Sequence, residues 1–232
     1  MKARRDIGRQ DLVLLGLTGS IGMGKSETAR MFRAEGVPVF DSDAEVHRLM
    51  GPGGEAVEKV EAAFPGVATG AAGSGQVSRN VSRNIPLDIA GKPCEKMIDR
   101  KLLGQRVFGD EAALRRLEKI LHPLVSAARH NFIRLKYAQG HRLIVLDVPL
   151  LFETGGDRLC DYTVVVTAPA FIQRQRVLAR PGMTAERFRL ILEKQMPDAQ
   201  KRRRADFIIQ TGLGKRYARE QVRRLVRYLS GV

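Results

Sequence analysis

The sequence predicts an α/β fold built on a parallel sheet with helices on both faces. Three observations lead to this prediction: short apolar runs recur along the chain, segments of helical periodicity separate most of them, and the first run leads into a glycine-rich turn. The 232 residues, of which 44% are hydrophobic and 28% charged, suffice for one such core with a subsidiary helical part.

The glycine-rich turn follows the first apolar run, residues 12–17, which is predicted to be a buried strand. Residues 19–26, GSIGMGKS, fit the pattern G-x-x-x-x-G-K-[ST], and a helix-forming run over 27–35 follows. In this P-loop the glycines let backbone N–H groups face phosphate oxygens, Lys25 reaches the β- and γ-phosphates, and Ser26 offers its hydroxyl to Mg²⁺. The chain is therefore predicted to bind a nucleoside triphosphate in a three-layer fold of the P-loop NTPase type.

The remaining predicted strands are four apolar runs, at 37–40, 143–148, 163–166 and 207–209. Between the second and third strands, residues 44–142 are mostly helical in pattern and are predicted to form an inserted helical subdomain. Four of its residues recur at helical spacing: Leu114, Leu117, Ile120 and Leu121. A stretch rich in Gly, Ala, Ser and Asn at 66–93 is predicted to be a surface loop within it. The core is then assigned residues 12–43, 143–172 and 205–232.

A basic segment at 173–204 follows the fourth strand and is predicted to be a helical lid. Its apolar residues share one helical face: Phe188, Ile191, Leu192 and Met196. In P-loop kinases for small molecules, closure of such a lid excludes water from the transferring phosphoryl group. The cations at 201–204 are interpreted as a solvated basic face. The final helix is predicted to pack on the sheet through residues at helical spacing: Val222, Leu225, Val226 and Leu229.

The formal net charge of +15 is unevenly placed, because residues 170–232 hold 16 Lys and Arg against 5 Asp and Glu. Such a field suits nucleic acid, and it equally suits a substrate and a cosubstrate that together carry several phosphates. Because no RNP, KH or zinc-finger pattern is present, nucleic-acid binding is not predicted, although a nucleic-acid-binding ATPase stays as the rival from another class.

Membrane association and disulfide formation are not predicted either. No apolar stretch approaches the ~20 residues that cross a bilayer, and the N-terminal residues lack the apolar core of a signal peptide, so a cytoplasmic protein is expected. Cys94 and Cys160 lie far apart in the sequence and are interpreted as structural thiols rather than as a disulfide or zinc ligands.

Two aspartates follow the second predicted strand, in the order Val39-Phe40-Asp41-Ser42-Asp43. The carboxyl end of a strand next to the P-loop strand opens into the active-site crevice, where a carboxylate can orient an acceptor hydroxyl and accept its proton. Strand alternation would place both side chains on one side, and Asp43 is the favoured base. The alternative is that either residue caps a helix beginning at Ala44. Asp147 closes the third strand, either as a Mg²⁺-linked Walker-B carboxylate or as a loop anchor.

Six segments in this order resemble the dephospho-coenzyme A kinase family: TGSIGMGKS, DSDAEVHR, IDRKLLGQRVF, LEKILHPLV, DVPLLFE and LEKQMPDAQKRRRADFII. The resemblance extends from Leu14 to about Gly214, and it implies an enzyme that phosphorylates the 3′-hydroxyl of dephospho-CoA with ATP and Mg²⁺. The chain departs from the family in the length of 66–93 and in Ile209-Gln210-Thr211-Gly212-Leu213, where an acidic strand end is common. A kinase for another small acceptor is the nearer rival.

The resemblance also implies roles for particular residues. The ATP phosphates would be surrounded by Gly22, Met23, Gly24, Lys25, Ser26 and Glu27. Thr18 and Asp43 would lie at the acceptor site with Asp43 as base, and Arg176 and Arg180 would meet the phosphates on lid closure. The acceptor and its CoA moiety would be bound by Pro149, Leu150, Arg100 and His122. Two alternatives for His122 are equally favoured. It contacts the substrate, or, as the residue before Pro123, it has no role beyond shaping the start of a helix.

Overall fold

The computed structural model describes residues 11–70 and 95–231. Cys94 and most of the predicted loop at 66–93 lie outside these residues. The described chain divides into two compact units, one that ends at Ser42 and resumes at Phe132, and one that spans Asp43–Asn131. The sequence-based boundaries were 44 and 142; the second boundary differs because the last turns of the long helix α5, Glu111–Ala138, belong to the first unit.

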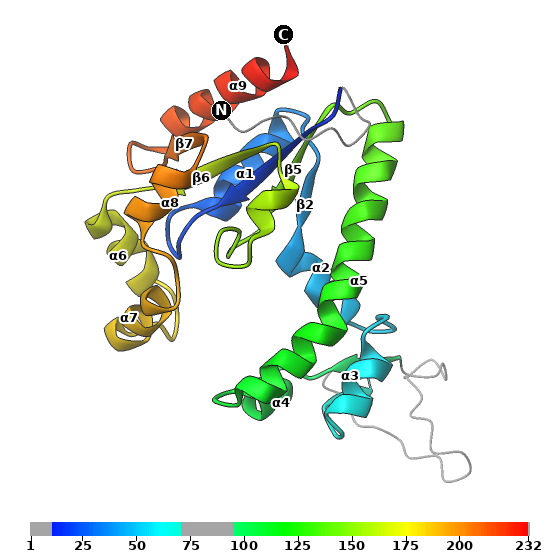
Figure 1. Ribbon diagram of the computed structural model, residues 1–232. Helices are drawn as coiled ribbons and strands as arrows, with labels where there is room; N and C mark the ends of the chain where they lie inside the picture. The colour runs from blue at the N-terminus through cyan, green and yellow to red at the C-terminus, as the bar shows by residue number, and fades with distance from the viewer. Residues whose placement is uncertain (1–10, 71–94, 232) are drawn as a thin grey trace, which may run out of the picture. The chain divides into compact units, whose positions relative to one another are not determined.

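The first unit is built on a five-stranded sheet in which every neighbouring pair is parallel (Figure 1). The strand order is β2-β5-β1-β6-β7. The strands are β1 (Val13–Thr18), β2 (Val39–Asp41), β5 (Leu143–Asp147), β6 (Tyr162–Thr167) and β7 (Phe207–Gln210). The predicted α/β fold with a parallel sheet is confirmed, and the strand that precedes the glycine-rich turn lies at its centre.

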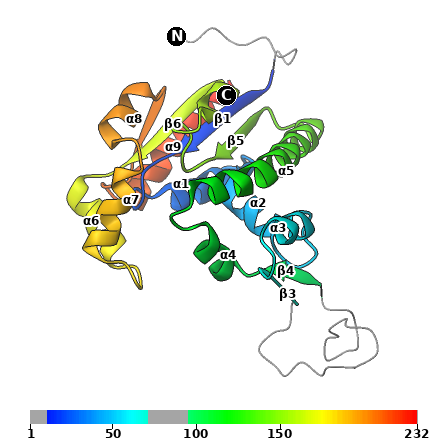
Figure 2. The same cartoon turned by 60° about the horizontal axis from the view of Figure 1, so that its bottom comes forward.

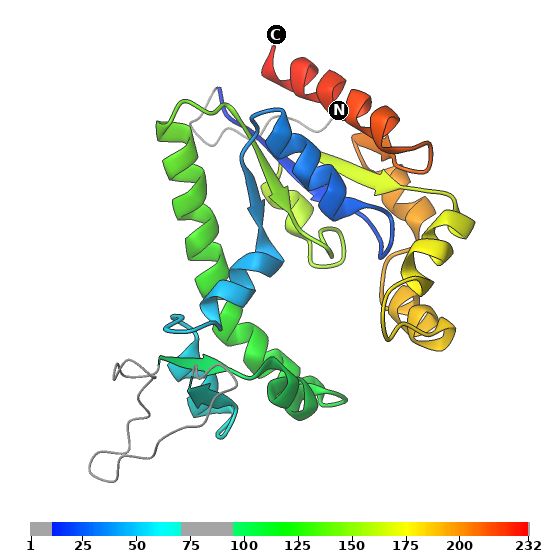
Figure 3. The ribbon, with the colours of Figure 1, turned by 180° about the vertical axis from the view of Figure 1, so that it is seen from behind.

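Helices cover both faces of this sheet. On one face, which Figure 3 turns toward the viewer, α1 (Lys25–Ala34) packs beside α9 (Lys215–Ser230). On the other face lie α8 (Asp198–Arg204) and the short 3₁₀ helix η1 (Gly156–Leu159). The strands are short and apolar because both of their faces are covered, as expected of a parallel sheet.

The core between the sheet and the α1/α9 layer consists of apolar side chains that alternate along the strands. Leu15 and Leu17 of β1 are fully buried, as is Phe32 of α1. The apolar stripe of the last helix was predicted to belong to this core, and that prediction is confirmed: Val222 and Leu225 are buried, and Val226 and Leu229 pack against them. Burial of each such side chain stabilises the fold by about 1.5–3 kcal/mol.

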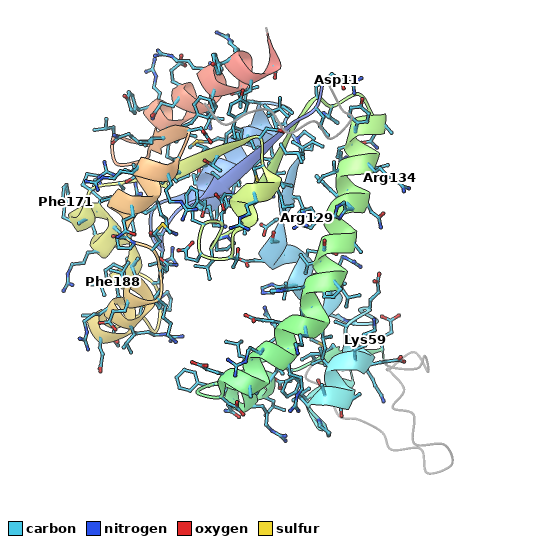
Figure 4. The ribbon with its side chains drawn as sticks, in the orientation of Figure 1. Asp11, Lys59, Arg129, Arg134, Phe171 and Phe188 are labelled. Atoms are coloured by element: carbon cyan, nitrogen blue, oxygen red, sulfur yellow. The ribbon has the colours of Figure 1, made fainter. Side chains whose placement is uncertain are left out.

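The segment predicted as a lid is helical. It comprises α6 (Ala170–Leu178), α7 (Ala185–Glu193) and α8, and α6 and α7 lie side by side in Figures 1 and 2. Figure 4 labels one aromatic residue on each of the first two helices: Phe188 of α7 is buried, whereas Phe171 of α6 is 71% exposed.

The second unit has a core of its own. Its elements are α2 (Ser42–Leu49, whose first residue belongs to the first unit), α3 (Val57–Ala63), β3 (Ala68–Gly70), β4 (Lys96–Ile98), α4 (Arg100–Val107) and the first turns of α5. Its buried side chains include Leu49, Val60, Val67, Ile98, Leu103, Leu117 and Leu121. The unit is mostly helical, but the antiparallel pair β3–β4 was not predicted, because three-residue strands carry no readable alternation.

No helix among the residues that the structure describes is long and apolar enough to span a membrane.

Candidate active site

The turn between β1 and α1 has the backbone geometry of an anion-binding loop. Gly22 has φ 77° and Gly24 φ 95°, values that glycine adopts readily and other residues avoid. Gly24 is the N-cap of α1, and no side chain caps this helix. The first N–H groups of α1 therefore point out of the helix with partial positive charge, which is the arrangement that binds phosphate.

The phosphate loop is held by packing from two sides. A Cβ on Gly22 would lie 2.5 Å from Cγ2 of Val177 and 3.1 Å from the carbonyl oxygen of Gln173, so α6 packs against this glycine. Met23 is buried, its Sδ accepts from the Ala168 N–H at 3.1 Å, and the Thr211 hydroxyl donates to its carbonyl oxygen at 2.7 Å. Met23 therefore anchors the loop through its side chain and its carbonyl oxygen, and its part in phosphate binding stays a prediction.

Lys25 is the first residue of α1, and its Nζ lies 2.6 Å from Oδ1 of Asp147. Asp147 ends β5, next to β1 in the sheet, and its side chain is 2% exposed. Asp147 is therefore directed at a residue of the phosphate loop, and its link to Mg²⁺ stays a prediction. An ammonium and a carboxylate at this depth are the charges needed beside a triphosphate and its metal ion.

Strand alternation predicted that the side chains of the two aspartates after the second strand lie on one side of that strand. The structure contradicts this prediction. β2 ends at Asp41, which is half-buried and paired in register with Asp147. The helix α2 begins at Ser42 rather than at Ala44, so Asp43 is exposed in its first turn and belongs to the second unit. A carboxylate in the first turn of a helix is stabilised by the helix dipole.

Two residues predicted at the acceptor site are brought together at the end of the sheet. Thr18, the last residue of β1, is fully buried, and its hydroxyl donates to the carbonyl oxygen of Pro149 at 3.0 Å. Leu150 follows with its side chain partly exposed. The loop after β5 is therefore fixed to the strand that leads into the phosphate loop.

Arg176 and Arg180 line one cavity of about 290 Å³ with Gly22, Gly24 and Glu27. Arg180 lies beyond the end of α6, so the two arginines, four residues apart, are not on one face of that helix. Instead the guanidinium of Arg176 donates to Thr211 at two atoms, to Oγ1 at 2.9 Å and to the carbonyl oxygen at 2.8 Å.

Two further residues of this cavity were not predicted. Thr211, buried after β7, joins Arg176 to the loop residue Met23, although it lies within the segment 209–213 that departs from the family pattern. Lys215 lies at the start of α9, with its Nζ 3.1 Å from Glu27, and this bond, together with the charge of Arg30, lowers the pKa of Glu27. No local pattern marks a single threonine or lysine for such a role.

The interpretation of 201–204 as a solvated basic face is wrong for its first residue. Lys201 is 0% exposed, and its Nζ lies 2.8 Å from Oε1 of Glu153. Burial raises the pKa of Glu153, but Lys201 and the Met196 N–H, which donates to the same oxygen at 2.9 Å, outweigh burial, so the pKa lies below its ordinary value. Arg204 also reaches the loop after β5, with Nη2 3.3 Å from Asp157.

The residues predicted to bind the CoA moiety lie in the second unit. Arg100 begins α4, and its guanidinium contacts the Nε2 of His47. His122 is exposed within α5, so the alternative in which it shapes a helix start is wrong, because Pro123 stands inside a continuous helix. The predicted site residues are thus divided between the units, with Asp43, Arg100 and His122 in the second.

Three features occur together in this site: a helix without a side-chain cap after a glycine loop, a lysine that faces an aspartate at a strand end, and a cavity lined by arginines. They are the features of a nucleotide-dependent phosphotransferase of the P-loop kinase class. A family model described as dephospho-CoA kinase matches residues 13–86 and 94–214. The chain belongs to the dephospho-CoA kinase family.

Similar proteins agree with this assignment. A dephospho-CoA kinase from Mesorhizobium japonicum is 50% identical over 220 residues, which cover 95% of this chain and 98% of the relative. One from Novosphingobium aromaticivorans is 50% identical over 214 residues, covering 92% and 93%. The crystal structure of TT1252 from Thermus thermophilus has a TM-score of 0.73 at 28% identity, covering 94% of this chain and 98% of that one. The dephospho-CoA kinase from Campylobacter jejuni shares the fold, with a TM-score of 0.58 at 20% identity and coverage of 94% and 98%.

Proposed function

We propose that this protein transfers the γ-phosphoryl group of ATP to the 3′-hydroxyl of dephospho-CoA, the last step of coenzyme A synthesis. The observation that carries the proposal is a phosphate loop with Lys25 beside Asp147, in a chain whose family model is that of dephospho-CoA kinase. The phosphate loop is the basis for the proposed nucleotide site, and membership in the family is the basis for the proposed acceptor.

Phosphoryl transfer spreads charge over the oxygens of the transferred group, so catalysis depends on positioned positive charge. In this proposal backbone N–H groups of residues 22–27 hold the phosphates, except that of Met23, which donates to the carbonyl oxygen of Ser20. Lys25 spans the β- and γ-phosphates. Arg176 and Arg180 add charge from the cavity that they line. The bonds from Arg176 to Thr211 orient its guanidinium for this contact, which reduces the entropy that it loses on binding.

The donor set beside the loop fits Mg²⁺. Ser26, the second residue of α1, has a hydroxyl oxygen, and Asp147 has a carboxylate at the same end of the sheet. Mg²⁺ prefers oxygen ligands and keeps several of its waters, with substrate phosphates completing the shell. Ser26 and Asp147 are the residues that would hold the ion. Bound there, the ion would neutralise charge on the β- and γ-phosphates.

The acceptor hydroxyl needs a group that aligns it and takes its proton as the new P–O bond forms. We assign this role to Asp43, on the family resemblance. The same resemblance assigns Thr18 and the Pro149-Leu150 turn to the binding of the acceptor. Arg100 and His122 are assigned to the CoA moiety, where a guanidinium suits its phosphate groups.

The positive charge of the C-terminal third is assigned to this phosphate chemistry and to internal ion pairs rather than to nucleic acid. Lys201, Arg202 and Arg204 each lie within 3.3 Å of a carboxylate oxygen, and Arg176 lines the nucleotide cavity. Titration with duplex DNA and structured RNA at about 150 mM salt tests this assignment, because binding to phosphates has a steep salt dependence. Sub-micromolar binding to either would contradict it.

A substrate panel tests the proposed reaction. The purified protein is given Mg-ATP with dephospho-CoA, with CoA, with adenosine and with a sugar acid, and ADP formation is followed together with product mass. CoA is the matched control, because it differs from dephospho-CoA only by the phosphate on the 3′-hydroxyl. We expect turnover with dephospho-CoA alone. Equal turnover with CoA, or turnover with the sugar acid only, would refute the acceptor assignment.

A further inference from the structure

Both peptide groups that flank Ile21 in the phosphate loop are held by glutamine side chains from the helical segment 173–204. The Ile21 N–H donates to Oε1 of Gln195 at 3.1 Å. Its carbonyl oxygen accepts from Nε2 of Gln173 at 2.8 Å. Gln173 lies in the first turns of α6 and is buried; Gln195 follows α7 and is half-buried.

The polarity of these two bonds is fixed by the backbone. A peptide N–H can only donate, so it faces the oxygen of Gln195, and a peptide carbonyl can only accept, so it faces the nitrogen of Gln173. The two amides are therefore not interchangeable, although the residues are chemically identical. Each satisfies one backbone group of a loop whose neighbouring N–H groups must stay directed at phosphate.

The next residue extends the connection. The backbone N–H of Met196 donates to Glu153 at 2.9 Å, and Glu153 lies in the loop that follows β5. Residues 195 and 196 thus join the phosphate loop to the loop that carries Pro149 and Leu150. On the other side, Gln173 belongs to the same helix as Arg176, which lines the nucleotide cavity.

We propose that Gln173 and Gln195 are positioning residues that set the phosphate loop for nucleotide binding by clamping the two peptide groups of Ile21. Because they stand near the two ends of the α6–α7 segment, they link the placement of that segment to the geometry of the loop. They act through Ile21 rather than on the substrate. The inference rests on the nucleotide-binding part of the proposed function and does not depend on the acceptor.

Matched substitutions test the clamp. Gln173→Met and Gln195→Met keep a long unbranched side chain and remove the hydrogen bond; Gln175→Met and Gln200→Met make the same change at exposed positions of α6 and α8. The readout is the dissociation constant of ADP by calorimetry, with KM values for ATP and for the acceptor measured separately. We expect each clamp variant to bind ADP roughly ten-fold more weakly, as for the loss of a bond that leaves a partly buried backbone group unpaired. The controls should stay within about two-fold, and the KM for the acceptor should not change.

Substitution by glutamate separates positioning from general destabilisation. Gln195→Glu keeps an oxygen for the Ile21 N–H, whereas Gln173→Glu places an acceptor against the Ile21 carbonyl, and both add the same negative charge. Gln195→Glu should therefore bind ADP more tightly than Gln173→Glu, and should recover part of the affinity lost in Gln195→Met. Gln173 is the more buried of the two, so a loss of fold stability alone would give the same order. ADP affinity is therefore compared at a temperature at which thermal unfolding shows both variants to be folded.

Different failures have different meanings. If wild-type protein binds ADP and both methionine variants bind it within two-fold of their controls, the clamp is overturned while the proposed function stands. Equal weakening by the two glutamate variants also overturns it, since bond polarity would then not matter. If Gln173→Met does not fold, the half-buried Gln195 and its glutamate variant still decide the question. Failure of the wild-type protein to bind ADP would overturn the proposed function and this inference with it.

Discussion

Replacing Lys201 by methionine should destabilise the first unit, although the residue stands in a run of four cations that reads as a solvated surface. The side chain is 0% exposed and its Nζ is 2.8 Å from Glu153, which is itself only 18% exposed. Lys201→Met keeps most of the packing volume and leaves a carboxylate with no cationic partner, which still accepts from backbone N–H groups, with Met196 as the main donor. Removing one partner of a buried pair costs about 3–5 kcal/mol. We take about 3 kcal/mol, since Glu153 keeps that donor and some contact with water.

For a chain of this length, about 3 kcal/mol corresponds to a fall of roughly 6–12 °C in melting temperature. Thermal unfolding followed by circular dichroism at pH 7.5 measures it, with Lys119→Met, an exposed lysine of α5, as the matched control. A fall equal to that of the control would refute the reasoning. The double variant Glu153→Gln, Lys201→Met should recover part of the loss, because it leaves no unpaired charge.

The same pair gives a pH dependence with a definite sign. The pKa of Glu153 in the folded protein lies below its ordinary value of 4.5, so its contribution to stability is complete above that value and is lost as the pH falls through the lower folded pKa. In Lys201→Met, burial still raises the pKa of Glu153, but the ammonium group that lowered this pKa is gone. The difference in stability between wild type and variant should therefore shrink below about pH 4.5. A constant difference down to pH 3 would contradict the assignment.

Three further predictions concern the site. Lys25→Ala should nearly abolish ADP formation, because it removes a charge from the phosphate cradle. Circular dichroism should show the fold to be intact, and full activity would contradict the P-loop role. Asp43→Asn should lower kcat by roughly 10²-fold with little change in ATP binding, and a kcat within about threefold of wild type would leave it only a first-turn residue of α2. Arg176→Ala and Arg180→Ala should both lower kcat/KM for ATP. Only Arg176→Ala should also lower the melting temperature, by about 2–8 °C, because it loses two hydrogen bonds. Equal changes in the two melting temperatures would contradict the structural role of Arg176.

The architecture of the first unit could be predicted because its determinants are local. Each apolar run in the sequence became a strand within two residues at either end, as with 12–17 and Val13–Thr18 or 163–166 and Tyr162–Thr167. The glycine loop has a fixed spacing because its backbone must turn at fixed positions. Both signals are contained in a window of about ten residues, so no knowledge of distant contacts was needed.

The contacts that organise the site could not be predicted, because they join residues far apart in the chain. Thr211 is 188 residues from the carbonyl that it binds in the phosphate loop, and Gln195 is 174 residues from Ile21. A basic run gives the same pattern whether its first lysine faces water or a buried carboxylate. Burial of Lys201 depends on where α8 meets the loop after β5, and that is a property of the assembled sheet.

Residue patterns and family resemblance contribute differently to the assignment of the catalytic carboxylate after β2. Placing Asp41 and Asp43 on one side required the strand period of two to continue through Ser42, but a helix begins there and the period changes. The sheet register instead singles out Asp41, which is aligned with Asp147 in the strand next to the phosphate-loop strand. The resemblance favours Asp43, through its place in DSDAEVHR. The catalytic assignment of Asp43 thus depends on the resemblance alone, and the kcat of Asp43→Asn, set against that of Asp41→Asn, decides between the two carboxylates.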